Sequence, residues 1–278
     1  MVKIALAQSQ DYYAIVKLIQ QDEPNFTWNT FKHKYLTRTN NILLIALINR
    51  KIVGFIGGLA AVLENNQTIY WAVDAVVDIH HRKQGIATQL LKALIYYGEY
   101  VMGIGVKNSH ILKAEINAGF KVGYHIHTCT YPPILPKRHA LEYVSLPDAQ
   151  RLMAQSIWKE NTHQFDFYYS NQNLYQVLKD VAQDILVVVK KEAFGLRVME
   201  CSQNTAYLSM VVKVGQHYGR RVRFLINKRH VSLIKVMYKI LAIPAKKPET
   251  LIYTHDFMQD LPIYFGHSDW FMEYDVLY

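Results

Sequence analysis

Residues 76–91 carry the feature that most constrains the fold, because an apolar strand, a basic turn and a helix that opens with a glycine follow one another directly. The segment reads Val-Val-Asp-Ile-His-His-Arg-Lys-Gln-Gly-Ile-Ala-Thr-Gln-Leu-Leu. A helix start presents unpaired backbone N–H groups and the positive end of the helix dipole, and a glycine there lets an anion approach the backbone. Arg82 and Lys83 add formal charge. The turn is therefore a candidate anion site, although many helices begin this way without a ligand.

The segments around this turn alternate between strand-like and helix-like hydrophobic patterns. Ahead of the turn the patterns predict one strand, two helices and three antiparallel strands, over 3–7, 9–20, 27–36, 42–48, 52–63 and 68–79. Behind it they predict helix, strand, helix and strand, over 85–102, 103–106, 108–118 and 121–131. This order indicates an α/β fold built on a mixed sheet.

Several single positions refine this reading. Thr27 is the expected N-cap of the second helix, and Gly119 the expected left-handed end of the last one. The glycines inside 52–63 predict a bulge or a close backbone approach. Strict alternation in 68–79 predicts two faces, Trp71, Val73, Ala75 and Val77 on one and Asp74, Val76 and Asp78 on the other.

Three prolines within residues 131–138 resist regular structure and predict a connection between two domains, 1–135 and 136–278. In the second of these the patterns predict helices over 146–159, 173–181, 205–218 and 230–241, and strands over 185–191, 196–201, 221–226 and 250–253. From the hairpin at 185–201 onward, this order repeats that of the first half. The repeat favours an internal duplication.

Composition narrows the class of protein. The 278 residues are 51% hydrophobic and 19% charged, which is typical of a folded globular chain, and the net charge of +9 favours anionic partners. The sequence predicts neither a membrane span nor a secretory signal, because its apolar runs are short. Cys129 and Cys201 lie far apart and the histidines form no metal-binding pattern, so we expect a cytoplasmic protein without a metal site.

Arg82-Lys-Gln-Gly85-Ile-Ala87, directly after a strand, resembles the hallmark of the GNAT superfamily of acyl-CoA-dependent N-acetyltransferases, Arg/Gln-x-x-Gly-x-Gly/Ala. A second feature of that superfamily, an Asn followed eleven residues later by Gly-Phe, is similar to Asn108 with Gly119-Phe120. The resemblance covers about residues 1–130. It implies a GNAT-like N-terminal domain that uses acetyl-CoA as cosubstrate.

The resemblance also implies roles for individual positions. The backbone of the strand end pairs with the pantetheine arm and polarises the thioester, which falls here on Ala75, Val76 and Val77. The pyrophosphate loop, bound mainly through backbone amides, corresponds to Arg82, Lys83, Gln84, Gly85, Ile86, Ala87 and Thr88. Asn108 corresponds to the helix start that touches the cofactor near its thiol arm. In this arrangement, backbone amides of the loop would hold the diphosphate, and backbone amides of the strand end would hold the oxyanion.

Transfer to an amine requires that the ammonium lose a proton before attack, so an acid or histidine is expected near the thioester. Asp74 is the first candidate for this base, ahead of Glu64, His80 and His81. The superfamily's frequent acid, a tyrosine seven residues after the Asn, is replaced here by Glu115. Glu115 could protonate the departing thiolate if burial raised its pKa. Two alternatives are that Glu115 binds the substrate amine, or that another tyrosine or water supplies the proton.

The resulting hypothesis is an acetyl-CoA-dependent N-acetyltransferase that acts directly on a primary amine of a small molecule, such as an amino sugar or an amino acid derivative. The second half lacks the phosphate loop at 201–206, so we expect a degenerate GNAT-like copy that walls the acceptor site or holds a homodimer. Two alternatives stay open at this point. One is a non-catalytic acyl-CoA sensor or scaffold, and the other is a nucleic-acid-associated protein that uses the basic clusters at 220–223 and 228–230.

Overall fold

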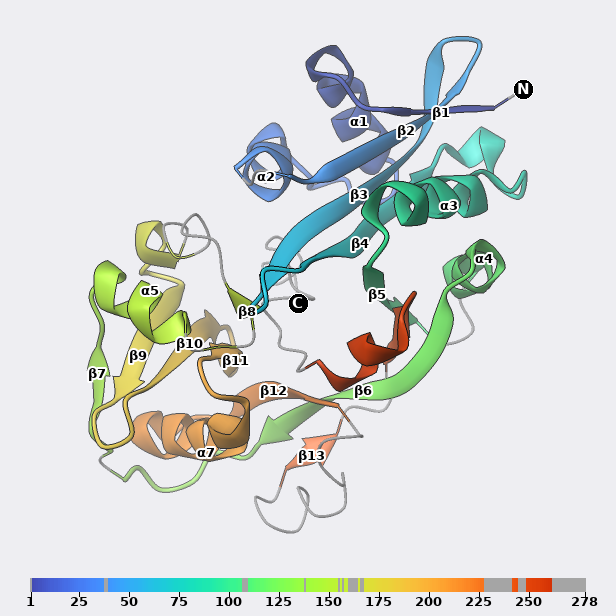
Figure 1. Cartoon of the computed structure of the whole chain (residues 1–278). Helices are drawn as coiled ribbons and strands as arrows, with labels where there is room; N and C mark the ends of the chain where they lie inside the picture. The colour runs from blue at the N-terminus through green and yellow to red at the C-terminus, as the bar shows by residue number, and fades with distance from the viewer. Residues whose placement is uncertain are drawn as a thin grey trace.

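The first half of the computed structural model is an ordered series of strands and helices (Figure 1). The structure describes residues 2–37, 40–106, 110–137, 139–154, 156, 158–159, 165, 168–227, 242–244 and 249–261. The elements up to the central strand are β1 (Lys3–Leu6), η1 (Ser9–Asp11), α1 (Tyr12–Ile19), α2 (Trp28–Phe31), the π-helix η2 (Lys32–Leu36), β2 (Ile42–Ile48), β3 (Lys51–Leu63) and β4 (Thr68–Val77). After it follow η3 (Ile79–His81), α3 (Ile86–Gly98), β5 (Val101–Val106), α4 (His110–Ala118) and β6 (Lys121–Tyr131).

The second half begins with a short strand and a helix and then forms a second set of strands. Its elements are β7 (Leu141–Tyr143), α5 (Leu146–Met153), β8 (Trp158–Lys159), β9 (Tyr175–Asp180), β10 (Ile185–Glu192), β11 (Gly195–Cys201), η4 (Asn204–Ala206), α7 (Tyr207–Tyr218), β12 (Val222–Asn227), β13 (Ile243–Pro244), β14 (Glu249–Tyr253) and η5 (Asp256–Asp260).

Most predicted elements are confirmed, including both helix ends. The Thr27 hydroxyl accepts a hydrogen bond from the amide of Thr30 at 3.1 Å, and Gly119 has φ +111°. Two helix predictions were too long: the helix from residue 146 ends at Met153, and α3 ends at Gly98, where a Cβ would lie 2.9 Å from the Tyr70 ring. The helix expected at 230–241 lies outside the described residues.

One element was predicted in the wrong class. Residues 173–181 were expected to be helical, but Tyr175–Asp180 is strand β9, which lies between β7 and β10. Its register with β10 runs from Tyr175 opposite Lys190 to Asp180 opposite Ile185. Pairing on both sides and burial of Val177 and Leu178 override a weak local helical pattern.

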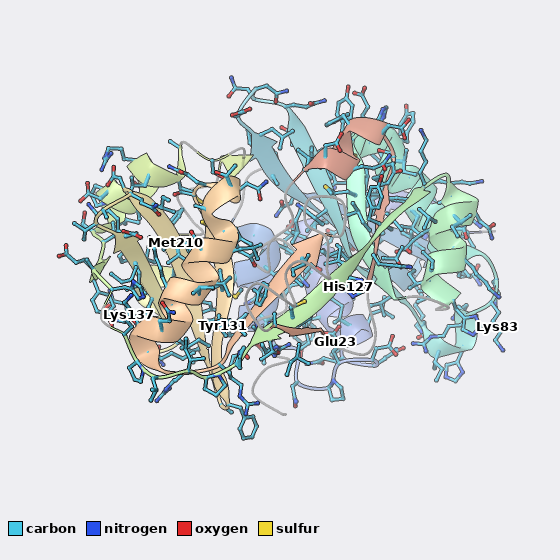
Figure 2. The ribbon with its side chains drawn as sticks, turned by 90° about the horizontal axis from the view of Figure 1, so that it is seen from below. Glu23, Lys83, His127, Tyr131, Lys137 and Met210 are labelled. Carbon is cyan, nitrogen blue, oxygen red and sulfur yellow. The ribbon has the colours of Figure 1, made fainter. Side chains whose placement is uncertain are left out.

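In the part of the chain that the structure describes, fourteen strands form one sheet that runs through both halves. Its order is β1-β2-β3-β4-β5-β14-β6-β12-β11-β10-β9-β7, with β13 beside β6 and β8 beside β3. In Figure 2, Lys83 lies near one end of the molecule and Met210 of α7 toward the other, with His127 and Tyr131 of β6 between them. Strand β6 therefore connects the two halves.

The pairing pattern of the first half recurs in the second. In each half an antiparallel series, β2-β3-β4 or β9-β10-β11, ends on a strand that pairs in parallel with the next one for only two residues. That next strand is β5 or β12, and each is flanked by a strand of the other half: β14 pairs with β5, and β6 pairs with β12. The two halves thus exchange their last strands, and β6 and β14 pair with each other at the centre.

Helices cover both faces of the first half of the sheet. On one face, Leu90 and Leu94 of α3 pack close to β3, because a Cβ at Gly58 would lie 2.6 Å from the Leu94 side chain. On the other face, α1 and α2 bury Ile15 and Phe31 against a separate core that continues into the second half. Within the described residues no helix is both long and apolar enough to cross a membrane.

Candidate active site

A bulge in β4 sets the geometry of the site. The register with β3 shifts between Phe55 and Gly57, and Asp74, in the bulge, has φ +52°. The predicted alternation is wrong beyond this point, since Val76 joins the core that contains Trp71, whereas Ala75 turns to the face covered by α3. An extra residue in one strand inverts which face each later side chain takes.

Strands β4 and β5 separate immediately before the bulge. They pair only through Tyr70 with Val101 and Trp71 with Met102. Beyond these pairs a cavity of about 250 Å³ opens between the strands, lined by Trp71 and Asp74 of β4, Ile104 of β5, and Glu115 of α4, which we call the inner cavity. Splayed parallel strands leave backbone groups of β4 available to an inserted ligand.

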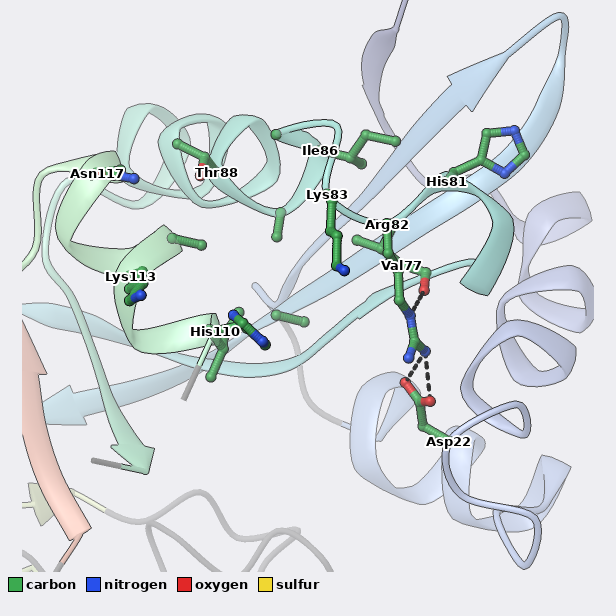
Figure 3. Close-up of a pocket in the computed structure, with 15 residues that line it drawn as sticks. Asp22, Val77, His81, Arg82, Lys83, Ile86, Thr88, His110, Lys113 and Asn117 are labelled. Carbon is green, nitrogen blue, oxygen red and sulfur yellow. Dashed lines mark hydrogen bonds and ion pairs between the residues drawn. The ribbon is translucent and has the colours of Figure 1, made fainter. Parts of the chain in front are cut away.

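A second cavity of about 420 Å³ lies between the turn after β4 and helix α4 (Figure 3). Its walls include residues 81–83 and Gly85 of the turn, the first residues of α3 and one face of α4, and we call it the outer cavity. The outer and inner cavities share Ala75 and Ile111 as lining residues. A ligand held at the turn can therefore extend toward the gap between β4 and β5.

Most of the cofactor residues expected from the sequence line the outer cavity. They are Ala75, Val77, Arg82, Lys83, Gly85, Ile86, Ala87 and Thr88. Val76 does not, because the bulge turns it into the opposite core, and Gln84 is exposed outside the lining. Asn108 lies outside the described residues.

The backbone amides at the start of α3 border the outer cavity. Gly85 precedes the helix with φ +76°, a conformation that favours glycine. In the described chain, none of the amides of residues 83–88 donates a hydrogen bond to a protein acceptor. Unpaired amides at the positive end of a helix dipole bind anions such as a diphosphate.

Arg82 lines this cavity but directs its guanidinium elsewhere. Its Nε donates to the carbonyl of Val77 at 2.9 Å, and its terminal nitrogen lies 2.6 and 2.8 Å from the two carboxylate oxygens of Asp22 (Figure 3). The pair is about two-fifths exposed, so it fixes the turn without strong electrostatic stabilisation. Lys83, by contrast, projects into the space between the turn and α4 (Figure 3).

The sequence interpretation missed the contribution of α4 to the outer cavity. His110, Lys113 and Asn117 all line it and follow one another at helical spacing, three and then four residues apart. That spacing places polar side chains on one helix face, opposite the turn with Lys83. The polar stripe was visible in the sequence, but only the fold shows that it faces the glycine turn.

Glu115 is the acid of α4 that reaches the inner cavity. The residue is 6% exposed, its Oε2 has no hydrogen-bond partner, and it lies close to Gly105 of β5. Burial raises the pKa of Glu115 to about 7, since desolvation disfavours the charged carboxylate. The side chain can therefore carry a proton at neutral pH, which is the condition that the sequence analysis set for an acid at this position.

Asp74, the predicted base, lies at the same cavity in a different setting. Its side chain is 1% exposed, and one oxygen, Oδ2, lies 2.6 Å from Nζ of Lys34 and accepts the hydroxyl hydrogen of Tyr35. The other oxygen, Oδ1, is buried without a hydrogen-bond partner. Asp74 is therefore an ion-paired carboxylate whose partners come from η2.

The other acids and histidines that the sequence suggested lie away from the Asp74 carboxylate. Asp78 does not share a face with Asp74: it caps η3 by accepting from the His80 amide, and hydrogen bonds from Gln21 and His81 lower its pKa to about 2. His81 lines the outer cavity, His80 is exposed, and Glu64 lies exposed in the turn at the other end of β4. Among the described side chains, no group of three or more potential metal ligands comes together.

Both cysteines are buried, and neither is a candidate nucleophile. Burial raises the pKa of Cys129 to about 11 and that of Cys201 to about 12. A thiol must ionise to act as a nucleophile, so neither is activated at neutral pH. The site thus presents amides, lysines and carboxyl groups, and no activated thiol.

The fold and the site have known counterparts. A GCN5-related N-acetyltransferase from Kribbella flavida superposes with a TM-score of 0.65 at 10% identity, over 90% of this chain and 71% of its own. A proposed acetyltransferase from Pyrococcus horikoshii gives 0.64 at 12% identity, over 97% of this chain and 95% of its own. A conserved Enterococcus faecalis protein, an N-acyltransferase candidate, gives 0.65 at 12% identity, over 91% of this chain and 72% of its own. These three structures share the fold of this chain, which is GNAT-like.

The family model of the GNAT acetyltransferases matches residues 8–113. The N-terminal part of the chain is therefore a domain of the GNAT acetyltransferase family, as the motif at the turn predicted. No protein of curated function matches the chain in sequence. The structural likeness extends beyond the matched residues into the second half, and at these identities it concerns the fold alone.

Proposed function

We propose that the protein is an acetyl-CoA-dependent N-acetyltransferase that transfers the acetyl group directly to a primary amine of a small molecule. The observation that carries this proposal is the group of unpaired amides at residues 83–88, which borders a cavity that continues toward Glu115. Lys83, His110 and Lys113 surround that cavity with positive or protonatable groups. A diphosphate bound at the turn would place its pantetheine arm along Ala75 and into the gap between β4 and β5.

The chemistry follows from the groups at the inner cavity. The neutral amine attacks the thioester carbonyl, and backbone N–H groups of the splayed β4 stabilise the oxyanion that develops. When the carbon–sulfur bond breaks, the departing thiolate takes the proton of Glu115, giving CoA thiol and an amide. The amine gives up its own proton to a base, and this proton ultimately restores Glu115 through solvent.

Direct transfer is favoured over an acyl-enzyme. A covalent intermediate requires an activated nucleophile, and the two cysteine thiols of the chain are held in their protonated form by burial. The inner cavity is lined instead by two carboxyl groups and apolar side chains. This arrangement suits a reaction in which the acceptor amine itself is the nucleophile.

The test is calorimetric titration of the protein with CoA and with acetyl-CoA, followed by a thiol-release assay over a panel of amines. Gly85→Asp and Gly85→Asn form a matched pair, because both residues tolerate a positive φ and differ mainly in charge. We expect CoA binding to weaken far more in Gly85→Asp, since its carboxylate would meet the diphosphate. Absence of CoA binding in the wild type would overturn the proposal, and binding without thiol release would favour the acyl-CoA sensor.

A further inference from the structure

The buried carboxylate of Asp74 is held by two residues that do not line the cavities. Lys34 and Tyr35 reach it from η2, and both are almost completely buried. Tyr35 fits only because residue 57 of β3 is glycine, since a Cβ there would lie 2.5 Å from Cε1 of the tyrosine ring. Two residues of η2 therefore hold the carboxylate, and Gly57 leaves the space that the Tyr35 ring occupies.

The backbone of Asp74 is the point where the sheet opens. Its φ of +52° is unfavourable for a residue with a Cβ, and such conformations persist where surrounding contacts enforce them. Asp74 follows the last β4–β5 pair, Trp71 with Met102, by three residues, and it lines the inner cavity. The contacts of its side chain thus hold the strand conformation that turns Ala75 toward the proposed cofactor.

The second half repeats this arrangement. Glu200 follows Arg197, the last β11 residue that pairs with β12, by three residues, as Asp74 follows Trp71. Glu200 is fully buried and accepts the hydroxyl hydrogen of Tyr168. The register of β11 with β10 also shifts beside it, between Val188 and Val189. A buried acid, a tyrosine and a strand irregularity therefore occur together in both halves.

The second half keeps this arrangement without a phosphate turn. Eight residues separate β4 from α3, but only five separate β11 from α7. The first residue of that helix, Tyr207, is buried, and its hydroxyl accepts a hydrogen bond from the amide of Leu225 at 3.2 Å. Leu225 stands two residues after the parallel pair, as Ile104 of the inner cavity does in β5. Tyr207 thus occupies the place that corresponds to the cavity.

We infer that Lys34, Tyr35 and Asp74 form a positioning cluster that holds the β4 bulge and so opens the acyl-transfer site, and that the Asp74 carboxylate is not the base that deprotonates the amine. The recurrence of an acid–tyrosine pair where the corresponding opening is filled supports a role in shaping the strand instead of in proton transfer. The inference deepens the proposed function and rests on it, because the opened gap is the proposed thioester site.

The decisive comparison is Lys34→Met against Lys34→Met/Asp74→Asn, measured by steady-state kinetics with acetyl-CoA across pH. The single variant leaves a buried carboxylate without its cation, so we expect the bulge to rearrange and kcat/KM to fall on the order of a hundredfold. In the double variant the neutral asparagine keeps the shape and tolerates positive φ. We expect the double variant to restore kcat to within about tenfold of the wild type and to keep the pH profile unchanged. If Asp74 were the base, its loss would instead lower the rate by about 10²- to 10⁴-fold.

A double variant that folds and binds acetyl-CoA but loses both kcat and the limb of the pH profile assigned to the base would overturn the inference. Glu200→Gln is the matched control in the other half, and we expect it to leave the KM for acetyl-CoA unchanged. If Lys34→Met does not fold, Tyr35→Phe, which removes only a hydroxyl, takes its place in the comparison. Amide hydrogen exchange at Ala75 and Val76 tests the bulge directly, and we expect it to be faster in Lys34→Met and restored in the double variant. This measurement does not need acetyl-CoA binding, so the inference and the proposed function can fail separately.

Discussion

Glu115 of α4 lies directly against Gly105 of β5, so that a Cβ at residue 105 would stand 2.9 Å from Oε2 of the glutamate. The missing side chain makes room for a carboxyl group at the floor of the inner cavity. Its Oε2 has no hydrogen-bond partner, and burial raises its pKa to about 7. A polar atom that is buried without a partner costs stability, which is expected where the group serves a reaction.

The first prediction concerns the pH dependence of the reaction. If protonated Glu115 delivers its proton to the thiolate, kcat falls as pH rises through about 7, where the group ionises. We expect Glu115→Gln to lower kcat about a hundredfold and to remove this alkaline limb, because the amide does not titrate. Initial rates from stopped acetyl-CoA assays over pH measure both effects. An unchanged alkaline limb in Glu115→Gln would assign the proton to another group.

The second prediction follows from the same pKa but concerns stability. The folded protein keeps the Glu115 proton up to about pH 7, whereas the unfolded chain releases it near 4.5, so the free energy of unfolding falls as pH rises through this window. A shift of that size corresponds to about 3 kcal/mol. We expect Glu115→Gln to be more stable than the wild type at about pH 8 and the difference to vanish near pH 4.5. Urea unfolding at several pH values measures it, and a pH-independent difference would contradict the raised pKa.

The third prediction concerns Asp22, which neutralises Arg82 at the edge of the outer cavity. Asp22→Asn removes a negative charge beside the proposed diphosphate site and releases the guanidinium. We expect the Kd for CoA to fall about two- to fivefold at low salt, and the gain to shrink at high salt because the groups are exposed. Arg82→Gln is the control, since it removes the cation as well. Weaker CoA binding in Asp22→Asn would mean that the pair is needed to hold the turn.

The sequence was sufficient for the features that depend on local pattern. The glycine turn, its strand and helix, and the glutamate seven residues after Asn108 follow from spacing along one segment, and the GNAT domain is confirmed over residues 8–113. The bulge at Asp74 could not be predicted, because contacts from Lys34 and Tyr35, some forty residues earlier, stabilise it. The alternation of side chains predicted for residues 68–79 was therefore continued past Asp74, where the bulge reverses it.

The exchange of β6 and β14 was hidden for a similar reason. Hydrophobic pattern identifies residues 250–253 as a strand but does not choose its neighbours, and the proline-rich segment at 131–138 suggested that contacts would stop there. In the structure Tyr131 packs under α7, where a Cβ at Gly215 would lie 2.5 Å from its ring. Long-range pairing of this kind is set by the whole sheet and not by any single segment.

The last prediction tests this exchange against the division of the chain at residue 135. A chain ending there would lose β14, which pairs with β5 over five residues and buries Leu251 and Ile252 completely. Those two side chains alone are worth about 3–6 kcal/mol, a large share of the 5–15 kcal/mol that typically stabilises a protein. We therefore expect residues 1–135 alone to give the circular dichroism spectrum of an unfolded chain and to bind no CoA. Co-expression with residues 136–278 is expected to restore both folding and CoA binding. A fragment 1–135 that folds and binds CoA alone would show that β14 is dispensable for the fold and for the site.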